Sequence, residues 1–228
     1  MLARVLEPEV MDTPEEARDY DAMDHAAVNR AFCEDVLAVL PTPKRVLDVG
    51  TGTARIPIEL CARSPGAEVV AIDLAEHMLT LARENITRAG LASRVTVAKI
   101  DAKALPYPDG SFGAVVSNSI IHHIPEPAQV LAEMWRVTSR GGLLFVRDLH
   151  RPETEAEIDH LVALHGGERP ADPAAVPSFE HQRFLFRASL AAALTVSEVA
   201  AFVAPLGIAA SAVRKTSDRH WTLSAVKP

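Results

Sequence analysis

The sequence of 228 residues predicts an α/β fold with a doubly wound, mostly parallel sheet of seven strands. Between residues 44 and 150, short apolar runs alternate with segments of helical spacing, which is typical of a parallel sheet with crossover helices. A glycine-rich turn follows the first of these runs, and two closely spaced strands at the C-terminus indicate an antiparallel pair. Because 48% of the residues are apolar, the chain can bury one core, and we expect a single domain over residues 1–228.

The first 40 residues have helical spacing, with Thr13 as an expected N-cap and Pro14 at the first helical position. They predict one or two leading helices ahead of the core. Within the core, at 44–150, strands are expected at 45–49, 68–73, 94–100, 112–117 and 143–149, the last after a turn at Gly141–Gly142. Helices are expected near 53–63, 75–89 and 126–138.

Residues 151–206 are expected to form a helical lid or insertion rather than more sheet. A helix begins near Glu153, a proline-rich loop runs through Pro177, and further helices cover about 181–204. The last segment, 207–228, then supplies the closing strands near 208–214 and 219–226.

Composition excludes several classes of protein. The formal charge of −7 and the pI near 5.7 argue against a nucleic-acid partner, because phosphate-backbone binding depends on clustered Lys and Arg. Cys33 and Cys61 form no C-x-x-C pair and no signal peptide precedes them, so a reduced, cytoplasmic protein is expected. Charged, proline and glycine residues interrupt the apolar stretch 188–213, so no membrane span is expected. The sequence leaves the oligomeric state open.

The stretch LDVGTGTARIPIEL, residues 47–60, contains the first two glycines of a dinucleotide-binding loop, Gly50 and Gly52, but Arg55 replaces the third. Asp48 precedes the loop, where it is expected to cap the loop close to a ligand. A positive charge at the start of a helix is unfavourable, so Arg55 indicates a nearby anion. The missing third glycine favours a ligand other than a dinucleotide.

The D-x-G-x-G pattern resembles motif I of the class I S-adenosylmethionine-dependent methyltransferases. Three later stretches support this resemblance in order and spacing: VVAIDLAEHML, VAKIDAKALPYPDGSFGAVVSNSIIHHIPEP and VTSRGGLLFVRDLHRP. The similarity spans residues 44–150 and is greatest to the ubiquinone/menaquinone biosynthesis methyltransferase-like group. It implies a Rossmann-like methyltransferase fold and S-adenosylmethionine as cofactor. The chain departs from the family at Phe112–Gly113, where Phe-Asp is usual.

The resemblance also implies a set of cofactor-binding residues. Asp73 accepts hydrogen bonds from the ribose hydroxyls, Asp101 meets the adenine amino group, and the amide of Ala102 meets a ring nitrogen. Tyr20 resembles the aromatic residue that closes over the cofactor, although it could equally be a packing residue. The whole expected set is Tyr20, Asp48, Gly50, Thr51, Gly52, Asp73, Leu74, Asp101, Ala102 and Ser117.

His122 and His123 follow the fourth expected strand, on the side where this family binds its acceptor. A histidine titrates near neutral pH, so either could orient or deprotonate a nucleophile, although simple packing explains each one equally well. Asp148, at the end of the fifth strand, is the third catalytic candidate and is preferred over His150. A metal site is not expected, because adjacent side chains on a strand or loop diverge.

We therefore expect methyl transfer from S-adenosylmethionine to a small-molecule acceptor by in-line displacement, in which the protein aligns the reactants and excludes water. The accepting atom, oxygen, sulfur, nitrogen or carbon, stays open. One alternative is a nicotinamide-dependent oxidoreductase, which shares Gly50, Gly52 and Asp73 but gives no role to Asp101. The other is a non-catalytic protein that binds S-adenosylmethionine.

Overall fold

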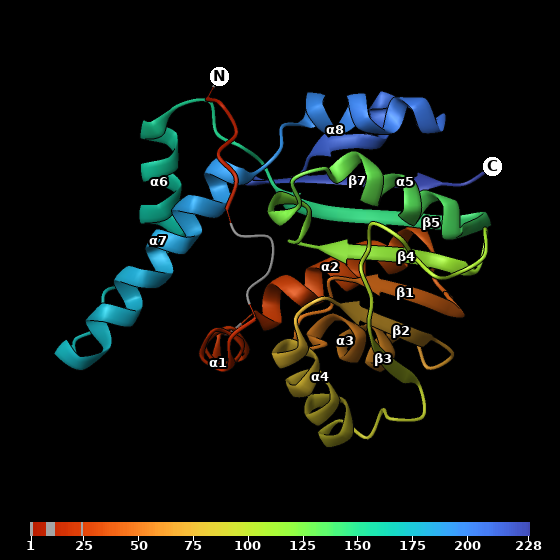
Figure 1. Cartoon of the computed structure of the whole chain (residues 1–228), viewed down its shortest axis with the longest axis horizontal. Coiled ribbons are helices and arrows are strands. Elements are labelled where there is room, and N and C mark those ends of the chain that lie inside the picture. Colours follow the sequence, from red (N-terminus) through yellow and green to blue (C-terminus); the bar gives the residue numbers. More distant parts are fainter. Residues whose placement is uncertain (1, 8–11, 24) are drawn as a thin grey trace.

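The computed structural model describes residues 2–7, 12–23 and 25–228. Within these residues, seven strands form one sheet in the order β3-β2-β1-β4-β5-β7-β6 (Figure 1). The strands are β1 (Arg45–Val49), β2 (Glu68–Asp73), β3 (Val95–Lys99), β4 (Phe112–Asn118), β5 (Thr138–Leu149), β6 (Val213–Lys215) and β7 (His220–Val226). The first five are parallel, and β7 is antiparallel to both β5 and β6. The predicted fold class is confirmed.

The centre of the sheet contains the topological switch. The chain builds outward from β1 through β2 to β3, then crosses back so that β4 pairs with the other side of β1. In that pairing Val46 is opposite Ala114, and Asp48 is opposite Val116. Ligands of open α/β sheets bind where the strand order reverses, so the carboxyl ends of β1 and β4 are the expected location of a site.

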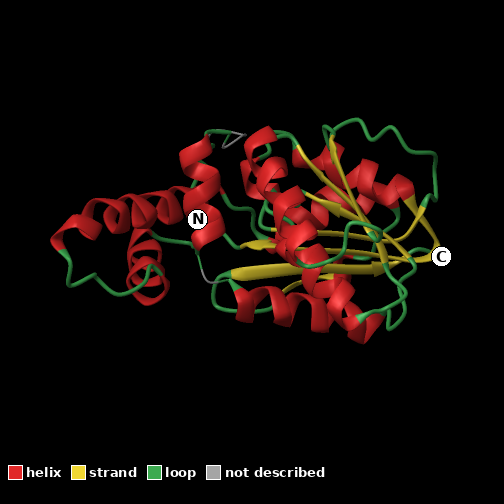
Figure 2. Cartoon of the chain, turned by 90° about the horizontal axis from the view of Figure 1, so that it is seen from below, coloured by secondary structure: helices red, strands yellow, loops and turns green. Residues whose placement is uncertain are grey.

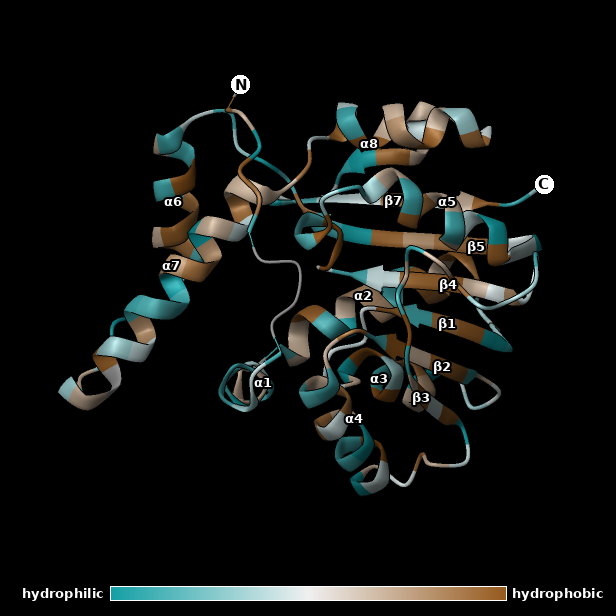
Figure 3. Ribbon diagram, viewed as in Figure 1, coloured by the Kyte–Doolittle hydropathy of each residue, from teal (hydrophilic) through white to brown (hydrophobic). Residues whose placement is uncertain are grey.

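Helices cover both faces of the sheet, as the view from below shows (Figure 2). Helices α2 (Ala26–Val39), α3 (Arg55–Arg63) and α4 (Glu76–Arg88) share one buried cluster with alternate strand residues such as Ala114 and Val116. Helices α5 (Pro127–Val137) and α8 (Val196–Val203) pack on the other face, with Val115. The strands are therefore apolar on both sides, which Figure 3 shows as brown bands through the sheet.

Three helices lie beyond the carboxyl ends of the parallel strands: α1 (Pro14–Ala22), α6 (Glu155–His165) and α7 (Val176–Ala192) (Figure 1). The predicted N-cap of α1 is confirmed, because Thr13 Oγ1 accepts from the amide of Glu16 and the Glu16 carboxylate accepts in return from the amide of Thr13. Short 3₁₀ turns occupy Ile121–His123, Pro173–Ala175, Ala204–Leu206 and Ala210–Ala212.

Apart from shifts of one or two residues, three features differ from the sequence prediction. The first closing strand is only Val213–Lys215, because a 3₁₀ turn occupies part of the predicted span. The proline-rich loop ends before Pro177, which lies in the first turn of α7, where an amide hydrogen is not needed. The Gly141–Gly142 pair lies inside β5, where the pairing with β4 shifts register and Gly141 takes a φ of 71°.

Cys33 and Cys61 are buried thiols with no disulfide between them. Across the described part of the chain, none of the helices combines the length and the apolar character that crossing a membrane requires.

Candidate active site

A cavity opens at the carboxyl ends of the central strands, at the topological switch. Seven of the ten predicted cofactor-binding residues line it: Tyr20, Gly50, Gly52, Asp73, Leu74, Asp101 and Ala102. The rest of the lining includes the apolar side chains of Val49, Ile72, Met78, Ile100, Ile120, Ile124 and Val130, together with His123. Asp48, Thr51 and Ser117 are not part of this lining.

The glycine loop forms one wall of the cavity. Gly50 and Gly52 take φ values of 73° and 53°, in the left-handed region that glycine adopts without strain. A Cβ on Gly50 would lie 2.2 Å from Cγ2 of Ile120, so a side chain here would displace the opposite wall. The amides of Gly50 and Thr51 both donate to the carbonyl of Ile72 at 2.9 Å, which fixes the loop against β2.

Asp73 connects the glycine loop to the loop that follows β2. Its Oδ2 accepts from the amide of Gly52 at 2.8 Å, and its Oδ1 accepts from the amide of Ala75 at 3.0 Å. Burial raises the pKa of Asp73, while these amide hydrogen bonds act in the opposite direction. Each carboxylate oxygen keeps acceptor capacity toward the cavity, which fits a pair of ribose hydroxyls.

Asp48 lies under the loop, 2% exposed. Its Oδ2 and the hydroxyl of Thr51 are buried and find no hydrogen-bond partner among the residues with described positions. Burial raises the pKa of Asp48 to about 7, the neighbouring Thr51 hydroxyl acts in the opposite direction, and the negative charge of Asp73 adds to the rise. A buried carboxyl group with unused acceptor capacity fits a ligand that brings a cationic group into this region.

Two further predicted residues, Asp101 and Ser117, have different surroundings. Asp101 lines the cavity, and its Oδ1 also accepts from the amide of Lys103 at 2.8 Å, so it caps its own loop as well. The hydroxyl of Ser117 donates to the carbonyl of Val49 at 2.9 Å and is fully buried. Ser117 therefore joins β4 to β1, and the geometry gives no support to the predicted cofactor contact.

The anion expected near Arg55 is Asp21. The Arg55 guanidinium lies 2.9 Å from Oδ1 of Asp21, which also accepts from Nδ2 of Asn85 at 2.9 Å. These contacts connect α1, which carries Tyr20 in the cavity lining, to α3 and α4.

The two histidines have different surroundings. His122 is 4% exposed, and its Nδ1 lies 2.5 Å from Oδ1 of Asp148. The Asp148 carboxylate also accepts from the amides of Ile121 at 2.5 Å, His122 at 3.2 Å and Leu149 at 2.6 Å. Burial alone lowers the pKa of His122, but Asp148 raises it, and the net pKa is higher than usual. Asp148, itself fully buried, positions His122 and is not part of the cavity lining.

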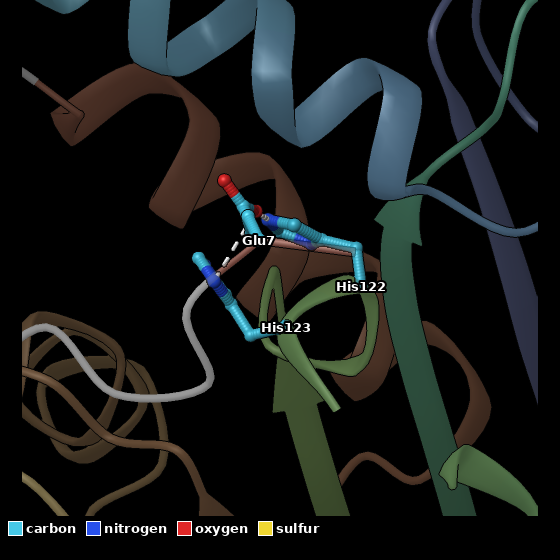
Figure 4. A group of neighbouring side chains, drawn as sticks. All are labelled: Glu7, His122 and His123. Carbon is cyan, nitrogen blue, oxygen red and sulfur yellow. Dashed lines mark ion pairs between the residues drawn. The ribbon is translucent and has the colours of Figure 1, made fainter. Parts of the chain in front are cut away.

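Glu7 is the residue at this site that sequence analysis missed. Its Oε1 lies 3.2 Å from Nδ1 of His123 and 3.5 Å from Nε2 of His122 (Figure 4). The first ten residues contain no motif, so nothing in the sequence pattern indicates that Glu7 reaches the turn Ile121–His123 after β4. The expectation that the histidines diverge is wrong, because they lie on a 3₁₀ turn, where their ring centroids are 4.2 Å apart.

Comparison with known proteins gives a consistent result for the core. A family described as "Methyltransferase domain" matches residues 47–146. The chain is 41% identical over 116 residues to a demethylmenaquinone methyltransferase of Thermus thermophilus, which covers 51% of this chain and 52% of that protein. It is also 36% identical over 159 residues to a malonyl-[acyl-carrier protein] O-methyltransferase of Geobacter sulfurreducens, which covers 67% of this chain and 57% of that protein. The chain thus spans about half the length of these relatives.

Solved structures resemble nearly the whole chain. A putative S-adenosyl-L-methionine-dependent methyltransferase of Methanococcus maripaludis aligns with a TM-score of 0.69 over 98% of this chain and 97% of that one. The sequence identity is 16%, so this likeness concerns the fold alone.

Proposed function

Because this chain belongs to the class I S-adenosylmethionine-dependent methyltransferases, in the ubiquinone/menaquinone biosynthesis methyltransferase-like group, we propose that it methylates a small-molecule acceptor. S-adenosylmethionine is its cofactor. One observation supports the proposal most strongly: Gly50, Gly52, Asp73 and Asp101 line a single cavity at the topological switch, in the order and spacing of the family motifs.

The cofactor supplies an activated methyl group on a sulfonium, so the chain's own residues have to bind, orient and keep water away. In the proposed arrangement Asp73 accepts from the ribose hydroxyls, and Asp101 and the amide of Ala102 contact the adenine. Asp48, buried under the glycine loop, would interact with the cationic end of the cofactor. Tyr20 and α1 cover the opening, and the Asp21–Arg55 ion pair holds them there.

His123 is the proposed acceptor-side residue, since it lines the cavity whereas His122 does not. It would orient the acceptor or remove its proton. The Asp148–His122 pair would hold the turn Ile121–His123 in position through its backbone hydrogen bonds.

As the first candidate acceptor, we propose an apolar molecule of the quinone type. The Thermus relative is named for demethylmenaquinone. The cavity wall is rich in apolar side chains such as Met78, Ile120 and Ile124. The Geobacter relative is named for malonyl-[acyl-carrier protein], so a malonyl thioester is the second candidate.

The other expectations stay part of this proposal: a single domain, no nucleic-acid partner and a cytoplasmic location. A non-catalytic cofactor-binding protein is the surviving alternative in principle, and the acceptor assay described at the end of the Discussion separates it from an enzyme.

Calorimetric titration tests the cofactor site. S-adenosylmethionine and S-adenosylhomocysteine should bind with a stoichiometry of about one per chain, and NAD should not bind, because Arg55 occupies the place of the third glycine. Asp73→Ala should lower the affinity for both S-adenosyl ligands by about 10- to 100-fold, the range for two lost hydrogen bonds to a charged group. Binding of NAD, or unchanged affinity in Asp73→Ala, would contradict the proposed ligand placement.

A further inference from the structure

Three side chains of metal-ligand type converge beside the cavity: Glu7, His122 and His123 (Figure 4). The ligand atoms that they offer all lie within 4.8 Å of one another. Their side chains are 9%, 4% and 21% exposed, so the group is largely shielded from solvent.

The spacing is close to that of a tetrahedral metal site. Zinc bonds to imidazole nitrogen and carboxylate oxygen of about 2.0 to 2.2 Å require ligand atoms about 3.3 to 3.6 Å apart. Oε1 of Glu7 lies 3.5 Å from Nε2 of His122 and 3.2 Å from Nδ1 of His123. Only small side-chain movements would therefore bring the three atoms to bonding distance from one ion.

The contact with Asp148 selects the tautomer of neutral His122 that a metal needs. Asp148 accepts from three backbone amides and faces Nδ1 of His122 at 2.5 Å, so Nδ1 donates its hydrogen to this carboxylate. The neutral ring then presents the lone pair of Nε2 toward Glu7. A carboxylate on the far nitrogen is the usual outer contact of a metal-binding histidine.

Glu7 is held in place from the other side. The hydroxyl of Ser189, on α7, donates to Oε2 at 3.3 Å, while Oε1 is buried and has no hydrogen bond within the described residues. The backbone before Glu7 is fixed to the end of α7, where Val5 donates to the carbonyl of Ala191 at 3.1 Å. The free oxygen of the carboxylate is therefore the one that faces the two rings.

From this geometry we propose that Glu7, His122 and His123 bind one divalent transition-metal cation, with Zn²⁺ as the best chemical match. Two histidines and one glutamate are a known catalytic zinc ligand set, and they leave a fourth position for water or an acceptor atom. His123 also lines the cavity, so the cation would lie beside the acceptor. With the cation bound, His123 would orient the acceptor through the metal and would not itself remove a proton.

The local charge is compatible with a dication. If both imidazoles are neutral, the two negative charges of Glu7 and Asp148 exceed the one positive charge of Arg4. The Arg4 guanidinium is close to the cluster, because it donates to the carbonyls of His122 and Ile124 at 3.0 and 2.9 Å. A bound dication would change the net charge of this group from −1 to +1. Imidazole nitrogen favours zinc and its neighbours over Mg²⁺ and Ca²⁺.

Metal binding to the chelator-treated full chain tests this proposal. Equilibrium dialysis should give one Co²⁺ per chain with visible absorption of a tetrahedral nitrogen and oxygen site, and Zn²⁺ but not Mg²⁺ should displace it. Glu7→Gln and His123→Ala should lose the bound Co²⁺. Ser189→Ala removes only the outer contact to Glu7 and should lower the affinity for Co²⁺ by about 10-fold.

Glu15→Gln and His181→Ala are the matched controls, because both residues are exposed and lie outside the cluster. Both should retain the Co²⁺, and circular dichroism should show that every variant is folded. If the wild type takes up no stoichiometric Co²⁺, or if Glu7→Gln binds as the controls do, Glu7 only forms ion pairs with the histidines. Because the readout is bound metal, that result leaves the methyl-transfer proposal intact.

Discussion

Neighbouring residues His122 and His123 are expected to respond differently to the same substitution. His123 lines the cavity, so His123→Ala should lower turnover by about 10²- to 10⁴-fold with cofactor affinity nearly unchanged. His122→Ala leaves Asp148 buried without its partner, which should destabilise the protein by about 3 to 5 kcal/mol and lower the thermal midpoint by roughly 6 to 20 °C. Turnover at saturating cofactor and the thermal midpoint should be measured for both variants.

Near-normal turnover in both variants would mean that the histidines only support the fold. A large fall in thermal midpoint for His123→Ala, with none for His122→Ala, would reverse the assignment of the two roles.

Asp48 should make the stability of the cofactor-free protein depend on pH. Its folded pKa of about 7 lies above its ordinary value of 3.8, so the protonated form stabilises the fold at low pH. This contribution is fully present below pH 3.8, decreases as the pH rises toward 7, and is absent above the folded pKa. Asp48→Asn removes the charge and should therefore raise the thermal midpoint, relative to wild type, more at pH 8 than at pH 5. Equal differences at the two pH values would exclude a buried Asp48 with a raised pKa.

At the scale of elements, the glycine loop has a matched internal control. Gly50 and Gly90 have nearly the same φ, 73° and 70°, but a Cβ on Gly90 meets no atom within 4 Å. Gly90→Ala should cost about 1 to 2 kcal/mol from the left-handed backbone alone. Gly50→Ala should cost more, because its Cβ would lie 2.2 Å from Ile120, and it should also weaken cofactor binding. Denaturant unfolding and calorimetry measure both effects, and equal losses in the two variants would contradict the close approach.

The sequence predicted some elements well for clear physical reasons. Local sequence specifies three features of the site. An apolar run predicts β1, glycine residues predict the loop that follows it, and the end of a strand predicts the position of Asp73. The alternation of strands and helices predicts the parallel, doubly wound sheet, whereas the strand order comes from the structure. These features place Gly50, Gly52 and Asp73 in one cavity, as expected.

Other features depend on contacts between distant parts of the chain, which local patterns do not record. Glu7 reaches His122 only because its segment packs along α7. The two histidines were expected to diverge because the 3₁₀ turn that carries them was not recognised. Ser117 fits the motif by position, but its hydroxyl is used to join two strands.

At the scale of the whole molecule, segment 151–206 should depend on the rest of the chain for its stability. Its helices α6 and α7 bury residues such as Leu161 and Leu190 in a cluster that includes Leu149 from β5. Arg151 donates to the carbonyl of Ala193 at 2.8 Å and pairs with Glu198, so the two ends of the segment are joined next to the sheet. We expect the isolated segment to show no cooperative thermal unfolding by circular dichroism. A cooperative transition, with the full-length protein as the reference, would identify it as a separate domain.

Transfer of a labelled methyl group tests the central claim most directly. The full chain should be incubated with methyl-labelled S-adenosylmethionine and a demethylmenaquinone analogue, a malonyl thioester or a fractionated pool of small metabolites, with Asp73→Ala as the control. We predict that label appears in a small-molecule product, in a molar amount equal to the S-adenosylhomocysteine formed, and that Asp73→Ala at the same subsaturating cofactor concentration forms much less. Tight cofactor binding with no labelled product from any fraction would contradict the account and identify the chain as a non-catalytic cofactor-binding protein.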